Sequence, residues 1–559
     1  MAEPRGEHRI PEAIASWYRN AGVRQCFGVV GSTNFEITRA LVDRGIEYIA
    51  ARHEMNAVVM AESWALVTGD VALVSVHAGP GLTNAATGIA EAAKSRTPMV
   101  VLAGEIANGA VQSNFAMDQA AFARALGAVP ERLHSPHTAL VDASRAFERA
   151  RRARRVVVLS MPLDVQAAPA NAARPAPPRV ARDERLTEPA EADIAELADL
   201  LEAAERPLIL AGHGALLSDA REALLEIGRR VGALLATTAR AHGLFVGDEW
   251  SLGIAGGFGS PAVVDLLPEA DLALGFGASY TKWTTRFGKL LRGAQHVVQI
   301  DADPAQLGVQ RPIDLAIAAD ARLVAEGLLA ELERRSVDRT GWRTPETAER
   351  VRRGANNSHP YEDGSTDHSI DPRTATKALD GLLPIERTLV TDGGHFSGWP
   401  TRHVRVPDGA GWVFKQSFMS IGLGLGTAIG AAVARPDRLT VMATGDGGFM
   451  MSVSDLETAV RSGLNMVIVV YNDSAYGAEV HHFEPLGLDT NIVRFPQVDF
   501  AQLGRGHGAD GVVVSRLEDL ESVRTWVNDG AQGVLVVDLR VPDDLVADWL
   551  EEAMSVERD

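Results

Sequence analysis

The stretch LTVMATGDGG, residues 439–448, is followed by a second apolar run, NMVIVVYND, residues 465–473. Each run is rich in β-branched residues and ends in glycine or polar residues, which is typical of a parallel strand buried on both faces. The segment between them, SVSDLETAVRSG, has a helical pattern, so the two runs predict one strand–helix–strand crossover. Asp446 and Asn472 should therefore emerge at the same edge of a sheet.

These two side chains offer a carboxylate and an amide oxygen, which are the hard ligands that Mg²⁺ prefers beside water and phosphate oxygens. The neighbouring glycines, Gly445, Gly447 and Gly448, allow the backbone to approach a diphosphate, and the following helix N-terminus favours negative charge. A GDG sequence alone also fits a tight turn with a capping Asp. The Asn at crossover distance favours a metal and diphosphate site.

The rest of the chain shows the same alternation of apolar runs and helical patterns. Two stretches rich in Pro, Gly or charge are interpreted as linkers, residues 169–193 and 336–370. The sequence predicts three α/β domains with doubly wound parallel sheets, residues 1–168, 194–335 and 371–559. Further strands are expected at residues 71–77, 98–104, 155–161, 206–212, 272–277, 296–301, 387–394 and 533–539.

Composition excludes several classes of function. The chain has 559 residues and a formal net charge of −19, and nucleic-acid binding requires Lys and Arg to neutralise phosphates. Cys26 is the single cysteine, so no intrachain disulfide can form. No apolar run is long enough to span a membrane. We expect a cytoplasmic protein with a small-molecule substrate and with neither nucleic acid nor membrane as a partner.

The segment that runs from GDGG to NDSAYG resembles the thiamine-diphosphate enzyme family, whose motif begins GDG and ends Asn-Asn. Asp473 stands here in place of the second Asn. The resemblance implies that Asp446 and Asn472 bind Mg²⁺, with the carbonyl of Ser474 as the third protein ligand. It also implies that Ala475 and Tyr476 contact the cofactor.

A second match is RHEMNAVVMAESWALVTG, residues 52–69, which is similar to the family segment that carries an activating glutamate. The matching residue is Glu54. In the family, this carboxyl group bonds to the aminopyrimidine ring nitrogen of the cofactor and promotes the tautomer that removes the thiazolium proton. The alternative interpretation is a first-turn glutamate that complements the helix dipole.

Two more segments are similar to family loops around the cofactor. FMSIGLGLGTAIGAA, residues 418–432, places Ile421 at the wedge between the two rings, with Met419 as a rival. TDGGHFSGW, residues 391–399, resembles the loop that touches the diphosphate. It implies contacts from Gly394, His395 and Phe396, although a histidine there could equally cap a turn.

Ser32 and His77 lie in GVVGSTNFE and VHAGPGLTNAATG, which match family loops over the thiazolium ring. Their positions face substrate in relatives such as benzoylformate decarboxylase, so the resemblance implies that Ser32 and His77 are catalytic here. A histidine titrates near neutrality and can relay protons or bind a carboxylate. The alternative is a histidine at a strand end that bonds only to backbone.

The resemblance extends over the three domains in acetolactate synthase order, and implies a pyrimidine-binding, a central Rossmann-like and a diphosphate-binding domain. It implies a carboligase: a 2-keto acid loses CO₂, and the resulting enamine attacks a second carbonyl. It also implies a homodimer or homotetramer with active sites at the subunit interface. FAD binds the central domain of acetolactate synthases, so FAD is left open here.

Three departures from acetolactate synthase keep other reactions open. Ala116 and Met117 follow Phe115 in place of Gln-Glu, a Gln-Trp pair is missing from GAEVHHF, and His77 replaces a small residue. The alternatives are a 2-keto acid decarboxylase, a carbon–carbon lyase or hydrolase on a 1,2-diketone or 2-hydroxyacyl substrate, and a relative without activity. The presence of Glu54, Asp446 and Asn472 together argues against the last.

Overall fold

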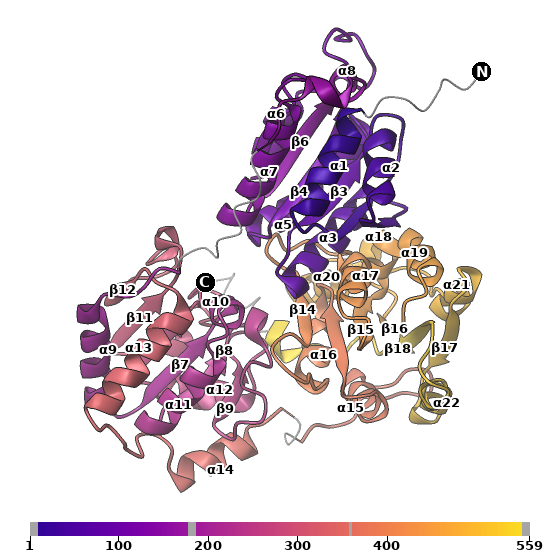
Figure 1. The fold of residues 1–559 in the computed structure, drawn as a ribbon. Helices are drawn as coiled ribbons and strands as arrows, with labels where there is room; N and C mark the ends of the chain where they lie inside the picture. Colours follow the sequence, from indigo (N-terminus) through magenta and orange to yellow (C-terminus); the bar gives the residue numbers. More distant parts are fainter. Residues whose placement is uncertain (1–8, 177–185, 357–359, 551–559) are drawn as a thin grey trace.

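The computed structural model describes residues 9–176, 186–356 and 360–550. This part of the chain forms three α/β units, each built on a six-stranded sheet in which paired strands run parallel (Figure 1). Helices flank each sheet, as expected when a crossover connects parallel strands. The predicted fold class, three doubly wound parallel-sheet domains, is confirmed.

The first sheet has the order β2 (Glu47–Ala50), β1 (Gln25–Gly28), β3 (Ala72–Val76), β4 (Met99–Glu105), β6 (Val156–Pro162), β5 (Val129–Arg132). The flanking helices are α1 (Ile10–Asn20), α2 (Phe35–Asp43), α3 (Glu54–Thr68), α4 (Pro80–Asn84), α5 (Ala86–Lys94), α6 (Gln119–Ala125), α7 (Ala139–Ala153) and α8 (Leu163–Gln166).

The central sheet has the order β12 (Leu315–Ile317), β11 (His296–Ile300), β10 (Leu272–Phe276), β7 (Pro207–Ala211), β8 (Leu234–Thr237), β9 (Ser251–Ile254). Its helices are α9 (Glu191–Ala203), α10 (His213–Leu217), α11 (Arg221–Val231), α12 (Pro261–Leu266), α13 (Ala321–Arg334) and α14 (Pro345–Arg353). Helix α14 lies inside the stretch interpreted as the second linker. Its Val351 joins Trp342 in the core of the central unit, so part of that stretch packs with this domain.

The third sheet has the order β14 (Trp412–Phe414), β13 (Arg387–Thr391), β15 (Leu439–Gly445), β16 (Met466–Asn472), β18 (Val534–Arg540), β17 (Asp510–Val514). Its helices are α15 (Pro372–Leu382), α16 (Gly398–His403), α17 (Gly424–Ala434), α18 (Asp446–Ser452), α19 (Leu456–Arg461), α20 (Gly477–Phe483), α21 (Phe500–Gly506) and α22 (Glu521–Asn528). The loops at the carboxyl ends of β13, β15 and β16 carry most of the residues predicted to face the cofactor.

The first and third units share a hydrophobic core, because α3 packs directly against α17 (Figure 1). Small residues on α17 allow this close approach. A Cβ atom on Gly430 would lie 2.1 Å from the carbonyl oxygen of Met60, so only glycine fits there. The amino end of α3, where Glu54 lies, is therefore held at the junction of the two units.

In the described ranges, none of the helices combines the length and the apolar character that a bilayer crossing requires.

Candidate cofactor and metal site

Asp446 opens α18 directly after β15 ends at Gly445. Its carboxylate accepts the N–H of Gly447 at 2.7 Å. Burial raises the pKa of Asp446 to about 6, while backbone N–H groups of Gly447, Ser474 and Ala475 oppose the rise. The loop after β16 thus lies against the Asp446 carboxylate, as the crossover pattern predicts.

Asn472 ends β16, and its side-chain orientation is fixed by two acceptors. Its Nδ2 donates to Oδ1 of Asp538 at 2.8 Å and to the carbonyl of Val498 at 3.1 Å. The amide oxygen therefore faces the opposite way, where it lies 3.3 Å from the backbone nitrogen of Ser474. Ser474 itself has a φ of 57°, a left-handed conformation that a non-glycine residue adopts at some cost.

The donors at this edge fit a divalent cation. Burial, followed by the charge of Asp446, raises the pKa of Asp473 to about 8. The two carboxyl groups therefore repel one another. A divalent ion would relieve this repulsion, and the oxygens of Asp446, Asn472 and the Ser474 backbone are the ligand type that Mg²⁺ takes.

Gly447 leaves space for an aromatic side chain over the metal loop. A Cβ atom there would lie 2.5 Å from Cε1 of Tyr476, so a side chain at position 447 would displace that ring. The Tyr476 ring makes an edge contact with Phe495, with ring centroids 4.8 Å apart.

Ala475 is buried beside Tyr476 and forms an isolated bridge with Arg494. Gly448 lies next to Ile421 and Asp392.

Asp392, which sequence reasoning missed, ties three of these loops together. Its buried carboxylate accepts N–H groups from Gly393 at 2.8 Å and Gly422 at 3.1 Å, and it lies 3.4 Å from the hydroxyl of Thr444. Burial raises its pKa to about 6. The signal available in the sequence was an aspartate at a predicted strand end, directly before the glycine pair of the diphosphate-like loop.

The loop after β13 places His395 and Phe396 inside the protein. Nε2 of His395 accepts the N–H of Ala547 at 3.0 Å, and burial, followed by the nearby His481, lowers the His395 pKa to about 3. The imidazole is therefore neutral, with one nitrogen engaged by the C-terminal segment. Phe396 stacks on Tyr471, with centroids 5.3 Å apart, and Gly394 has a φ of 141°, in the glycine-favoured region.

Glu54 is the first residue of α3 and is only 9% exposed. Its Oε2 accepts the side-chain N–H of Asn84 at 3.0 Å, a contact that the sequence did not reveal. Among the described residues, no hydrogen bond joins Glu54 to the loops that carry Asp446 and Asn472 of the same chain.

His77 and Ser32 lie together, as predicted for loops over one ring. Nδ1 of His77 is 2.7 Å from the carbonyl of Ala78, and a carbonyl only accepts, so Nδ1 carries a hydrogen. Nε2 faces the hydroxyl of Ser32 at 3.2 Å. Phe115 makes an edge contact with the imidazole, with centroids 4.9 Å apart. The loop that departs from the acetolactate synthase pattern thus borders His77.

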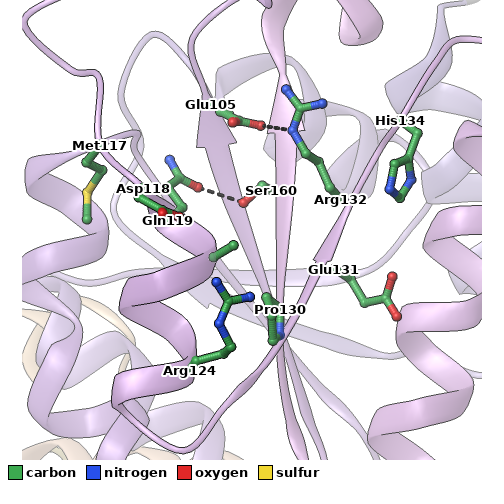
Figure 2. A pocket seen from close by; sticks show the side chains of 11 residues that line it. Glu105, Met117, Asp118, Gln119, Arg124, Pro130, Glu131, Arg132, His134 and Ser160 are labelled. Carbon is green, nitrogen blue, oxygen red and sulfur yellow. Dashed lines mark hydrogen bonds and ion pairs between the residues drawn. The ribbon is translucent and has the colours of Figure 1, made fainter.

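A separate cavity of about 440 Å³ lies beside β4, β5 and β6 of the first unit (Figure 2). None of the predicted site residues lines it. Its charged side chains are largely engaged: Arg132 donates to Glu105 at 2.8 Å, and Glu131 pairs with Arg145 at 2.7 Å. Ser160 donates to Gln119 at 2.9 Å. Because these groups already have protein partners, we assign no ligand to this cavity.

The three units match three models of one family. Residues 8–124 match the N-terminal thiamine pyrophosphate-binding domain of thiamine pyrophosphate enzymes, residues 194–328 the central domain, and residues 392–539 the C-terminal thiamine pyrophosphate-binding domain. The chain therefore belongs to the thiamine pyrophosphate enzyme family, and it is an enzyme of the transferase or lyase type.

Relatives extend along almost the whole chain. A sulfoacetaldehyde acetyltransferase of Rhodobacter capsulatus is 28% identical, over 97% of this chain and 96% of its own length. The acetolactate synthase large subunit of Parasynechococcus marenigrum is 29% identical, over 90% and 83%. A probable 2-ketoarginine decarboxylase of Pseudomonas aeruginosa is 29% identical, over 95% and 93%. These relatives are described as a transferase, a synthase and a decarboxylase.

Proposed function

We propose that this protein is a thiamine-diphosphate- and Mg²⁺-dependent carboligase that acts on a 2-keto acid such as pyruvate. The observation that carries the proposal is the loop after β16, where the amide oxygen of Asn472 lies 3.3 Å from Ser474 and the Ser474 N–H acts on Asp446, together with the buried carboxyl group of Glu54 at the start of α3. The relatives described as an acetyltransferase and a synthase favour ligation over simple protonation of the fragment left after CO₂ loss. We propose the cytoplasm as its compartment.

When bound, thiamine diphosphate supplies the carbon nucleophile and the electron sink that cleavage beside a carbonyl requires. Asp446, Asn472 and the carbonyl of Ser474 would hold Mg²⁺. Other residues would contact the cofactor through backbone groups or apolar surface, with Ile421 against its rings: Gly394, His395, Phe396, Gly445, Gly447, Gly448, Ala475 and Tyr476. Of these, His395 is restricted to its Nδ1 side, because Nε2 is already bonded.

Glu54 would hold a proton at the pyrimidine ring nitrogen. Asn84 donates to one of its two oxygens, which leaves Oε1 to make that contact. The low exposure of Glu54 restricts the access of water to this carboxyl group. In this arrangement Glu54 would act in catalysis, whereas the alternative is a first-turn glutamate that only complements the helix dipole.

His77 and Ser32 form the polar pair proposed to face the substrate. Because Nδ1 of His77 carries a hydrogen, a neutral imidazole presents the lone pair of Nε2 and can accept the Ser32 proton. The protonated imidazole would donate a hydrogen bond to a substrate carboxylate or a proton to the reacting carbon of the substrate. This proton donor favours a second candidate function, a 2-keto acid decarboxylase that releases an aldehyde.

We further propose a homodimer or a dimer of dimers, in which Glu54 of one subunit faces the metal loops of its neighbour. The support is that large apolar side chains in and near those loops are exposed, since exposed apolar groups that gather on a surface mark protein contacts. The exposed residues are Phe418, Met419, Ile421, Met450, Met451, Tyr476, Leu488 and Ile492. Sedimentation equilibrium should give at least twice the chain mass of 59.6 kDa.

Two measurements test the function. Calorimetry should detect uptake of thiamine diphosphate that depends on Mg²⁺, and its failure would remove the cofactor assignment. Product analysis with pyruvate, with and without an acceptor aldehyde, then separates the two candidates. A ligated hydroxyketone or acetolactate is expected, whereas acetaldehyde as the sole product under both conditions would replace carboligase with decarboxylase.

A further inference from the structure

A buried cluster of charges lies where the first and third units meet, away from the metal loops. Glu62 of α3 and Lys415, which directly follows β14, form an ion pair at 2.6 Å, with side chains 0% and 2% exposed. Ser95 donates to the other oxygen of Glu62 at 2.5 Å. Burying an ion pair removes water from both charged groups, which costs free energy. The burial of Glu62 and Lys415 therefore indicates a role beyond simple stabilisation.

Glu91 of α5 provides a second attachment to the same segment. Its two carboxylate oxygens accept the backbone N–H groups of Ser417 at 2.9 Å and of Phe418 at 2.6 Å. Burial, followed by the charge of Glu62, raises the Glu91 pKa, while these N–H groups and Lys415 oppose the rise. Arg240 of the central unit acts electrostatically on both glutamates, so all three units meet at this cluster.

The attached segment, residues 415–421, has neither helix nor strand. It connects β14 to α17, and its course therefore depends on contacts with other elements. Met419 has a φ of 60°, which strains the backbone of a non-glycine residue, and its side chain is 71% exposed. Burial of the Met419 side chain therefore does not offset this strain. The carboxylates of the first unit compensate by fixing the positions of residues 415, 417 and 418.

Two other side chains of this segment lie over the glycine loops of the cofactor site. A Cβ atom on Gly393 would lie 2.3 Å from Nε2 of Gln416 and 2.8 Å from Cδ1 of Ile421. A Cβ atom on Gly448 would lie 3.3 Å from Cγ2 of Ile421. The segment is thus anchored on one side by Glu62 and Glu91, and faces the site on the other.

We propose that Glu91, assisted by the Glu62–Lys415 ion pair, is a positioning residue that holds segment 415–421 so that Ile421 lies against the bound cofactor. This inference rests on the proposed function, because Ile421 is the proposed cofactor contact. Helix α3 would then act at two positions. Its first residue, Glu54, would contact the pyrimidine, and Glu62, two turns later, would hold the segment that supports the cofactor rings.

A double-mutant cycle with full-length protein tests the proposal. The measurements are the Kd of thiamine diphosphate at saturating Mg²⁺, by calorimetry, and the near-ultraviolet circular dichroism of the bound cofactor. Glu91→Gln should weaken binding about tenfold or more, the range seen when a supporting hydrogen-bond partner is removed. Ile421→Ala should weaken binding as well. The double variant should bind as Ile421→Ala does, because Glu91 acts through Ile421.

The matched control is Glu457→Gln. Glu457 pairs with Arg52 at 2.7 Å and so also bridges the first and third units, but at an exposed position away from segment 415–421. This variant should keep the wild-type Kd and dichroism. Wild-type binding by Glu91→Gln, or effects of Glu91→Gln and Ile421→Ala that multiply in the double variant, would each overturn the proposal.

Two further measurements keep the outcome clear. Trypsin should cleave the apo form of Glu91→Gln after Lys415 faster than it cleaves the same bond in wild type, where the Lys415 side chain is 2% exposed. If Glu91→Gln does not fold, the charge-balanced variant Glu62→Gln/Lys415→Met carries the same test, and it should also weaken binding. If the wild-type protein does not bind thiamine diphosphate, the proposed function is wrong. If the wild type binds it, and Ile421→Ala weakens binding but Glu91→Gln does not, only this inference is wrong.

Discussion

Asp538, wholly buried on β18, accepts the side-chain N–H of Asn472 at 2.8 Å and thereby directs the Asn472 oxygen toward Ser474. Without this acceptor the amide could rotate and present its NH₂ group to a cation. A residue far along the chain thus decides whether Asn472 can act as a metal ligand.

We therefore expect Asp538→Ala to weaken Mg²⁺-assisted binding of thiamine diphosphate by about tenfold to a hundredfold, the usual effect of losing a ligand-orienting partner. Calorimetry at fixed Mg²⁺ measures the change. Asp510→Ala, at an exposed position on neighbouring β17, serves as the control and should bind normally. Equal affinities for the two variants would show that Asp538 does not orient the ligand.

Glu54→Gln should lower turnover by about a hundredfold or more, because an amide cannot exchange the proton at the pyrimidine nitrogen. The Gln oxygen still accepts from Asn84, so the cofactor Kd should change little. Steady-state kinetics and calorimetry on the same preparation separate the two quantities. Glu47→Gln, at an exposed position on β2, should leave both unchanged. Nearly intact turnover in Glu54→Gln would refute the proposed role.

His77→Ala should lower kcat/KM by about a hundredfold, within the range of lost proton transfer from a positioned side chain. Ser32→Ala should have a smaller effect, because it removes one neutral partner of His77 at 3.2 Å. Thr83→Ala, on the neighbouring helix α4 and with a hydroxyl that donates to the Pro80 carbonyl, is the control. If His77→Ala and Thr83→Ala behave alike, His77 does not act on the substrate.

Acid should destabilise the fold through His242, whose ring packs edge-on against Trp412. Burial lowers the pKa of His242 to about 4. The unfolded chain takes up the proton near pH 6.5, so the free energy of unfolding falls as pH drops from 6.5 toward 4. The loss reaches about 3 kcal/mol at pH 4, at about 1.4 kcal/mol per pKa unit.

His242→Phe keeps an aromatic ring and removes the titration. Its Tm should fall less than that of wild type between pH 7.5 and pH 5, by scanning calorimetry. His296→Asn, at an exposed position on β11, should follow wild type. An unchanged pH dependence in His242→Phe would show that other groups determine the acid sensitivity.

The central parts of the fold could be predicted from the sequence because buried parallel strands are continuous apolar runs. Every such run quoted above forms a strand, from β3 and β4 to β16 and β18. The missed strands include the sheet edges β2, with EYIA, and β5, with VPER. An edge strand is half solvated and carries charged residues, so its pattern does not differ from that of a loop.

By itself, the sequence determined the crossover that brings Asp446 and the loop after Asn472 together, because strand–helix–strand geometry is local and obeys a fixed handedness. The tertiary structure alone decided the orientation of Asn472 by Asp538, the bond of Asn84 to Glu54, and the attachment of residues 415–418 to Glu62 and Glu91. Each of these contacts joins residues far apart in the chain, where neither spacing nor periodicity limits the possible partners, and only packing of the three sheets selects one.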